Sequence, residues 1–179
     1  MIIIGLGHKA RQGKDAFGRF LVKAGMNQGH YIKQYAFADA LKDYCRVAFG
    51  MREKNGRMLQ LVGTDLFRNH VNVDIWPTIL QDKLEEDKPD IAIITDVRFV
   101  NEARFIRNEM NGVTVRIQRY INQGDGYRPF IAQDRDPNHP SETELEDDKY
   151  WNYTLSNDGD LKHLESKAHD FLINEILAQ

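Results

Sequence analysis

Short apolar runs alternate along the chain with longer stretches in which apolar residues recur three or four positions apart. Strands are predicted at residues 2–6, 31–37, 91–96, 113–118 and 152–156, and most of them look buried on both faces, above all the unbroken apolar runs 2–6 and 91–96. The stretches with helical spacing predict helices at residues 14–26, 38–50, 57–69, 74–87, 100–110 and 161–176. This alternation is typical of an α/β fold, in which helices cover both faces of a parallel five-stranded sheet.

One domain accounts for all 179 residues. Ligands of such sheets bind beyond the carboxyl ends of the strands. We therefore expect one site to be built from four loops, at residues 7–14, 96–101, 119–141 and 156–160. Gly124, Gly126 and Pro129 follow one another closely, which predicts an irregular lid over residues 120–140.

Composition and charge narrow the possible functions. The chain has 41% hydrophobic and 28% charged residues, as globular proteins do, and its net charge of −3 argues against a general nucleic-acid binder. Cys45 is the single cysteine, so no intrachain disulfide is possible. No signal peptide and no apolar run of about 20 residues is recognisable, so we expect a cytoplasmic protein that binds neither polymeric nucleic acid nor a membrane.

The stretch GLGHKARQGKD, residues 5–15, joins the first predicted strand to the first predicted helix. A glycine-rich turn that ends in Gly-Lys in this setting is typical of a phosphate-binding loop (P-loop), whose backbone N–H groups surround a phosphate. Gly13 permits close approach of the backbone, and Lys14 brings a catalytic cation to the phosphates. The residues expected to bind ATP are Gly7, His8, Lys9, Ala10, Arg11, Gln12, Gly13, Lys14, Asp15 and Ala16.

Two positions of this loop depart from the usual pattern. His8 stands where the opening glycine would fall, and Asp15 stands where a hydroxyl side chain usually follows the lysine. A carboxylate beside a polyphosphate is repelled unless a cation lies between them, so Asp15 is a candidate residue for positioning Mg²⁺. The alternative is that Asp15 only caps the helix near its positive end, and the two roles are compatible.

Several motifs occur in the order found in a known family. The stretch KARQGKDAF resembles the GKD loop of the bacteriophage-type deoxynucleoside monophosphate kinases, a branch of the P-loop kinases. Further stretches that resemble this family span nearly the whole chain: FADALKDYC, MLQLVGTDLFRNHV, DIW, TDVRFVNEA, HPSETELE and LSNDGDLKHL. HPSETELE also looks like a helix start, with Ser141 as cap and Glu144 at the capping-box position.

The resemblance implies a three-layer P-loop kinase fold with an acceptor-binding helical insertion at residues 37–87 and a lid at residues 120–140. It implies that ATP donates its γ-phosphoryl group to a deoxynucleoside monophosphate, with Mg²⁺ as cofactor. It is also compatible with a homodimer. A phage-encoded enzyme of this family would act in the cytoplasm of its bacterial host.

Asp96 ends the third predicted strand, and Arg98 follows two residues later. A carboxylate at this place points toward the ligand site, so we expect Asp96 to hold the hydration shell of Mg²⁺ or to orient Lys14. The alternative is that Asp96 caps the following helix. Arg98 is a candidate to bind the acceptor phosphate through its guanidinium, and the alternative is a surface ion pair with Glu102.

Three arginines, Arg119, Arg128 and Arg135, flank or occupy the expected lid. Arginines that close over a transferring phosphoryl group stabilise its charge and expel water, which makes Arg119 the first candidate for catalysis and Arg128 another. The alternative is that the charges of a solvated lid have no role.

The remaining candidates lie in the insertion and near the last strand. Because this insertion holds the acceptor in nucleoside monophosphate kinases, Arg68 is a candidate for its phosphate. Asp39 is a candidate to contact its sugar, and the alternative is that Asp39 caps the helix. Trp76 is a candidate to stack on the base, although an aromatic residue on a helix more often belongs to the core. Asn157 lies in a turn expected near the adenine of ATP.

Three functions fit these features. The first is a deoxynucleoside monophosphate kinase. The second is another small P-loop kinase, with an acceptor such as phosphomevalonate or a ribonucleotide. The third is a regulatory nucleotide-binding ATPase without a small acceptor. The long helical insertion and the arginine-rich lid favour a kinase.

Overall fold

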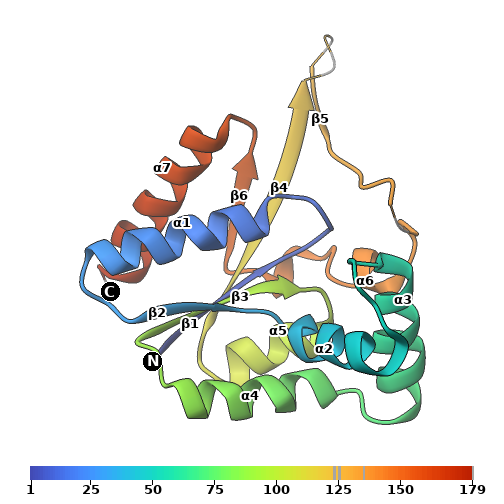
Figure 1. The fold of residues 1–179 in the computed structure, drawn as a ribbon. Coiled ribbons are helices and arrows are strands. Elements are labelled where there is room, and N and C mark those ends of the chain that lie inside the picture. Colours follow the sequence, from blue (N-terminus) through green and yellow to red (C-terminus); the bar gives the residue numbers. More distant parts are fainter. Residues whose placement is uncertain (123, 125, 135, 179) are drawn as a thin grey trace.

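The computed structural model describes residues 1–122, 124, 126–134 and 136–178. Its sheet lies between two layers of helices (Figure 1). Five parallel strands form this sheet in the order β2 (Ile32–Tyr35), β3 (Ile91–Val97), β1 (Ile2–Gly7), β4 (Val113–Asn122) and β6 (Tyr153–Asn157). The predicted α/β fold with a parallel five-stranded sheet is therefore confirmed.

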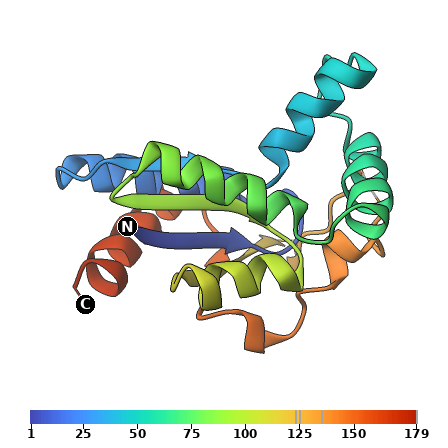
Figure 2. The ribbon, with the colours of Figure 1, turned by 90° about the horizontal axis from the view of Figure 1, so that it is seen from below.

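Two hydrophobic cores lie on opposite faces of the sheet. Ile3 packs into one core, while Ile4 and Leu6 pack into the other, because successive side chains of a strand point to opposite faces. One face is covered by α1 (Lys14–Asn27) and by α7 (Leu161–Phe171), which continues as the π-helical turn η4 (Leu172–Ile176). The other face is covered by α4 (Ile75–Asp87), α5 (Val100–Arg104) and its continuation η2 (Phe105–Glu109), as Figure 2 shows. Burial on both faces explains the unbroken apolar runs in the sequence.

The expected lid is more regular than the sequence indicates. The strand β4 runs on to Asn122, and β5 (Tyr127–Pro129) pairs antiparallel with this extension, with Tyr120 opposite Pro129. This hairpin projects beyond the sheet (Figure 1). The prediction of an irregular segment is wrong for the first part of residues 120–140, because a hairpin outside the core has no apolar run to mark it.

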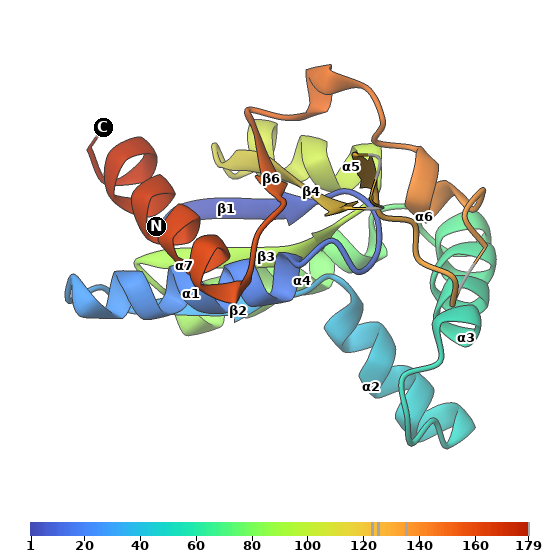
Figure 3. The same cartoon turned by 90° about the horizontal axis from the view of Figure 1, so that it is seen from above.

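The helical insertion lies between β2 and β3, and its last helix is α4. It begins with α2 (Ala38–Phe49), which ends at Gly50 as predicted, where the backbone turns left-handed at φ 64°. It continues with α3 (Gly56–Gln60) and the π-helical segment η1 (Leu61–Arg68). Figure 3 shows α2 and α3 standing away from the sheet, on the side toward which β1 points. No helix in the described ranges is both long enough and apolar enough to cross a bilayer.

The short helix α6 (Pro140–Thr143) begins differently from the prediction. His139 is its cap, and Nδ1 of this histidine accepts the backbone N–H of Ser141 at 3.1 Å. The carboxylate of Glu144 does not turn back on its own helix but accepts the N–H of Val100 in α5 at 2.9 Å. The predicted cap at Ser141 and the predicted capping box are therefore wrong. A 3₁₀ turn η3 (Asp148–Tyr150) then leads to β6.

Candidate active site

A cavity of about 670 Å³ opens beyond the carboxyl ends of β1 and β3. Its walls come from the P-loop and the start of α1, from the insertion, and from the end of β3 and the start of α5. The π-helical segment η1 forms part of the wall, and such segments often occur at functional sites. The cavity lies at the strand ends, where the sequence predicts the site.

The P-loop has the backbone geometry of a phosphate-binding turn. Gly13 is left-handed at φ 99°, and a Cβ there would lie 2.5 Å from the side-chain nitrogen of Asn157, so only glycine fits. The N–H groups at the start of α1 have no acceptor within the helix, and Lys14, Asp15 and Ala16 lie in the cavity wall. A helix start of this kind attracts anions.

His8 has the backbone conformation of the glycine that it replaces. Its φ is 85°, in the left-handed region that costs a residue with a Cβ roughly 1–2 kcal/mol. The imidazole lies edge-on to Trp151 with ring centroids 6.3 Å apart, and its Nδ1 is buried without a hydrogen-bond partner among the described residues. Burial, together with the charges of Arg116, Lys9 and Lys14, lowers the pKa of His8 to about 4. The ring is therefore neutral at physiological pH.

The lowered pKa of His8 has a measurable consequence for stability. Between pH 6.5 and pH 4 the unfolded chain binds a proton at His8 that the folded chain excludes, so the free energy of unfolding should fall as the pH falls through this window. The limit is about 1.4 kcal/mol per pH unit, reduced because the ring is partly exposed. Urea unfolding of the wild type and of His8→Asn, which tolerates φ > 0, should give a flatter slope for the variant. Parallel slopes would contradict the assignment.

Lys14 lies on the inner side of the P-loop. The residue is 6% exposed, and its Nζ donates to the carbonyl oxygens of His8, at 3.3 Å, and Lys9. Burial is the largest influence on its pKa, which falls to about 7, and repulsion by Arg98 adds to this effect. The nearby carboxylates of Glu142 and Asp15 act in the opposite direction. A bound phosphate would act as the counterion of this buried ammonium group and would stabilise its charged form.

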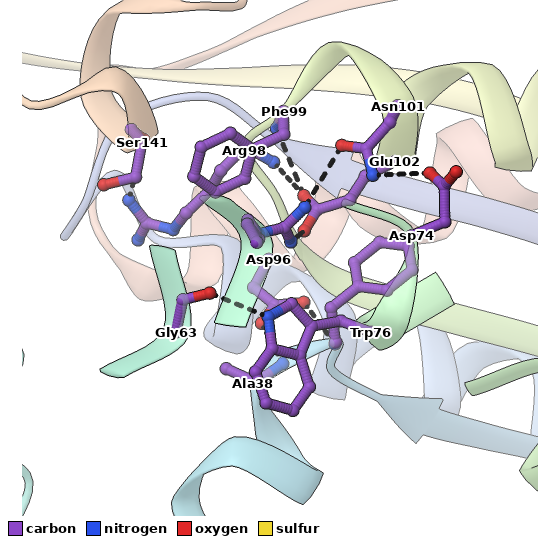
Figure 4. A network of polar contacts seen from close by, with 12 residues as sticks. Ala38, Gly63, Asp74, Trp76, Asp96, Arg98, Phe99, Asn101, Glu102 and Ser141 are labelled. Atoms are coloured by element: carbon purple, nitrogen blue, oxygen red, sulfur yellow. Dashed lines mark hydrogen bonds and ion pairs between the residues drawn. The ribbon is translucent and has the colours of Figure 1, made fainter. Parts of the chain in front are cut away.

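Asp96 connects the sheet to the insertion. Its two oxygens accept the backbone N–H groups of Phe37, at 2.7 Å, and Ala38, at 2.9 Å, at the start of α2 (Figure 4). The capping alternative is thus partly correct, but the capped helix is α2 rather than the helix that follows Asp96. Burial raises the pKa of Asp96, and the two N–H groups oppose the rise. Asp96 and the exposed Asp15 both lie in the cavity wall.

Arg68 and Glu102 form a buried ion pair in the cavity wall. Arg68 is 8% exposed and Glu102 is 2% exposed, and the guanidinium of Arg68 stacks 4.1 Å from the ring centroid of Phe99. Glu102 also accepts the backbone N–H groups of Arg98, at 2.8 Å, and Phe99, at 3.1 Å. Burial raises the pKa of Glu102, and the charge of Arg68 opposes this rise. Figure 4 shows this network around Asp96 and Trp76.

The guanidinium of Arg98 does not pair with Glu102. It pairs with Glu142 in α6 and donates to the carbonyl oxygen of Ser141 at 3.3 Å, which rules out the alternative of a surface pair with Glu102. Trp76 is buried at 5% exposure, and its indole N–H donates to the carbonyl oxygen of Gly63 at 3.1 Å. The indole therefore belongs both to the core and to the cavity wall.

Other candidates lie outside the cavity wall. Asp39 is exposed, accepts the N–H of Ala36 at 3.0 Å and pairs with Lys42 at 2.8 Å. Arg119 is exposed and stacks over Phe130 at 4.9 Å, and Arg128 is an exposed residue of β5. Among the described residues, the wall includes none of these three, nor Asn157, Gly7, His8 and Lys9. Arg135 lies outside the described residues.

Asn157 and Gln12 hold the P-loop from the side of the hairpin. The side-chain amide of Asn157 donates to the carbonyl oxygen of Gln12 at 2.9 Å. The buried side chain of Gln12 donates to the carbonyl oxygen of Phe130 at 2.9 Å and accepts the N–H of Arg119 at 2.5 Å. In this structure Asn157 supports the loop, and Gln12 ties the loop to the base of the hairpin.

Sequence reasoning missed two buried carboxylates of the site, Glu102 and Glu142. It treated Glu102 only as a surface partner and gave Glu142 no role. The available signal was that each lies in a motif of the resemblance, TDVRFVNEA and HPSETELE. Lys42 and Gln60, which also lie in the cavity wall, carry the same signal, since Lys42 lies in FADALKDYC and Gln60 in MLQLVGTDLFRNHV.

Comparisons with known proteins identify the family of the chain. The sequence profile of the family described as Deoxynucleotide monophosphate kinase matches residues 56–168. The deoxynucleoside-5'-monophosphate kinase of Escherichia phage T5 is 34% identical over 124 residues, which are 64% of this chain and 44% of that protein. The chain thus matches less than half the length of this relative. A putative deoxynucleotide monophosphate kinase of Acanthamoeba polyphaga mimivirus is 29% identical across 93% of this chain and 94% of the relative.

Solved structures agree on the fold. Shikimate kinase from Acinetobacter baumannii has a TM-score of 0.53 and 14% identity, with 99% of this chain and 96% of that chain covered. At this identity the likeness shows the three-layer P-loop kinase fold alone. The family profile covers more than half of the sequence, including the end of β3, α6 and the start of α7. The chain therefore belongs to the deoxynucleotide monophosphate kinase family.

Proposed function

We propose that this protein transfers the γ-phosphoryl group of ATP to a deoxynucleoside monophosphate. One observation carries the proposal: a single cavity brings the P-loop lysine Lys14 together with two arginines, Arg68 and Arg98, and with the indole of Trp76. A donor polyphosphate fits the start of α1, where N–H groups and Lys14 meet its negative charge. An acceptor phosphate fits the arginines, and its base fits the aromatic wall.

Each residue then has a defined part in the reaction. Lys14 stabilises negative charge on the transferring phosphoryl group. Such electrostatic stabilisation matters because the protein contributes little covalent chemistry to phosphoryl transfer. Arg98 and Arg68 bind the acceptor phosphate and orient its oxygen for in-line attack. Arg119 and Arg128 lie on the hairpin outside the cavity wall, so a catalytic role for either requires the hairpin to move toward the cavity.

The donor set in the cavity fits Mg²⁺. Asp15 and Asp96 both lie in its wall, whereas no group of three or more His, Cys, Asp or Glu side chains able to hold a metal occurs among the described residues. This matches an ion that takes few protein ligands and completes its shell with waters and phosphate oxygens. Bound Mg²⁺ would neutralise charge on the donor phosphates. Asp15 and Asp96 would hold its hydration shell.

Asp15→Asn tests this arrangement by the sign of its effect. With Mg²⁺ present, the variant should bind ATP about five- to tenfold more weakly, because an anionic anchor for the hydrated ion is lost. With EDTA present, it should bind ATP as well as the wild type or better, because a repulsive charge is gone. Asp15→Ser should restore part of the Mg²⁺-dependent affinity. The measurement is calorimetric titration of the three proteins in both conditions, and equal weakening in both would reduce Asp15 to a helix cap.

The proposed activity is tested by turnover on a panel of phosphate acceptors. A coupled assay of ADP formation would compare the four common deoxynucleoside monophosphates, their ribonucleotides and phosphomevalonate, with ATP as donor. We expect the highest kcat/KM with a deoxynucleoside monophosphate. A preference for another acceptor would indicate a different small P-loop kinase. ADP formation that no acceptor accelerates would indicate a regulatory ATPase.

A further inference from the structure

Glu142 joins two segments that contribute to the cavity wall, the P-loop and the residues that follow β3. The residue is 6% exposed, and its Oε2 accepts the backbone N–H of Ala10, in the P-loop, at 2.8 Å. Its Oε1 pairs with Nη1 of Arg98, at the end of β3. Two residues that are 88 positions apart thus bind the same carboxylate, through different oxygens.

These contacts fix both partners. Ala10 is 1% exposed, so water cannot readily replace Glu142 as the partner of its N–H. The guanidinium of Arg98 also donates to the carbonyl oxygen of Ser141, the neighbour of Glu142 in α6, at 3.3 Å (Figure 4). The helix α6 therefore holds the arginine at two points.

Glu142 also acts through its charge. Its carboxylate pairs with Arg98 and interacts electrostatically with Lys14, and these two cations repel each other. A buried anion beside both cations reduces that repulsion.

We infer that Glu142 is a positioning residue that fixes the P-loop and the acceptor arginine relative to one another. Through Ala10 it fixes the position of the P-loop, which binds the phosphoryl donor. Through Arg98 it fixes the position of the guanidinium that binds the acceptor phosphate. It contacts neither substrate in this arrangement. The second part of this inference rests on the proposed function, whereas the first part requires only ATP binding.

The test compares Glu142→Gln with the wild type and with Glu165→Gln as control. Glu165 also pairs with a cation, Lys23 at 2.6 Å, but lies on α7 and away from the cavity. An amide cannot accept from both Ala10 and Arg98, because its NH₂ group must face one of the two donors. We expect Glu142→Gln to raise the Kd of ATP without acceptor about fivefold and the KM of the acceptor about 30-fold, with a smaller change in kcat. The control should differ from the wild type by less than twofold in each quantity.

A second background separates positioning from general damage. In Arg98→Ala, the same Glu142→Gln change should raise the acceptor KM less than threefold, because the group through which it acts is gone, while its effect on ATP affinity should persist. Glu142→Asp keeps the charge but is one methylene too short to reach both partners. Glu142→Asp should likewise raise the Kd of ATP with or without Arg98 and raise the acceptor KM only when Arg98 is present. It replaces Glu142→Gln if that variant does not fold.

The outcomes are distinct. An unchanged Kd for ATP in the Glu142 variants would overturn the inference, whether or not the wild type phosphorylates a deoxynucleoside monophosphate. An equal rise of acceptor KM with and without Arg98 would also overturn it. If the wild type phosphorylates none of the acceptors on the panel, the proposed function is rejected. The Kd of ATP in the Glu142 variants would then still test the role of Glu142 at the P-loop.

Discussion

Replacing Lys14 by alanine is expected to lower kcat by about 10²–10³, the range found when one preorganised charge-stabilising donor is removed. The physical reason lies in the position of its ammonium group, which is buried on the inner side of the P-loop and faces the backbone carbonyls of His8 and Lys9. The two arginines proposed to bind the acceptor are already paired, Arg98 with Glu142 and Arg68 with Glu102.

The same substitution should not reduce stability. Burial lowers the pKa of Lys14 to about 7, which means that the folded chain disfavours the charged form. Between pH 7 and pH 10.5 the unfolded chain binds a proton at Lys14 more readily than the folded chain, so this residue opposes folding as the pH falls through that window. Lys14→Ala removes this cost, and its free energy of unfolding at pH 7 should equal or exceed that of the wild type.

Steady-state kinetics and urea unfolding of Lys14→Ala check both expectations. Lys23→Ala is a suitable control, because Lys23 lies on the same helix, is exposed and pairs with Glu165 at 2.6 Å. A kcat within about tenfold of the wild type, or roughly 1.4 kcal/mol in barrier, would be too small for the role assigned to Lys14. A large loss of stability would show instead that Lys14 supports the fold.

The sequence was sufficient wherever structure depends on neighbours along the chain. Apolar runs located the central strands, and Gly50 marked the end of α2, where the backbone is left-handed. The approximate place of the site followed from the same pattern, because strand ends of a parallel sheet meet at one edge. The strand β5 escaped prediction because it lies outside the core.

Contacts between distant segments could not be read from the sequence. Asp96 caps a helix that begins 58 residues earlier, and Arg98 pairs with a carboxylate 44 residues later. The sequence displays only neighbours at helical spacing, which is why Glu102 was considered as the partner of Arg98. In the fold, Glu102 pairs instead with Arg68, 34 residues away, and Arg98 pairs with Glu142.

The buried pair of Arg68 and Glu102 leads to the second large expected effect. Glu102→Gln should cost about 3–5 kcal/mol of unfolding free energy, because it leaves the guanidinium of Arg68 buried without a counterion. The glutamine can still accept the N–H groups of Arg98 and Phe99, so the loss reports on the charge rather than on the cap of α5. Urea unfolding measures this loss.

Removing both charges should restore stability but not function. In Arg68→Met/Glu102→Gln no buried charge is left unpaired, and a methionine of similar length can pack against the ring of Phe99. We expect the double variant to be at least about 2 kcal/mol more stable than Glu102→Gln, since pairs in direct contact are strongly non-additive. Its kcat/KM for the acceptor should nevertheless fall about 100-fold, because the cation proposed to bind the acceptor phosphate is lost. Additive losses of stability would mean that the two side chains act independently. A double variant that is stable and fully active would mean that the pair supports the fold and does not bind the acceptor.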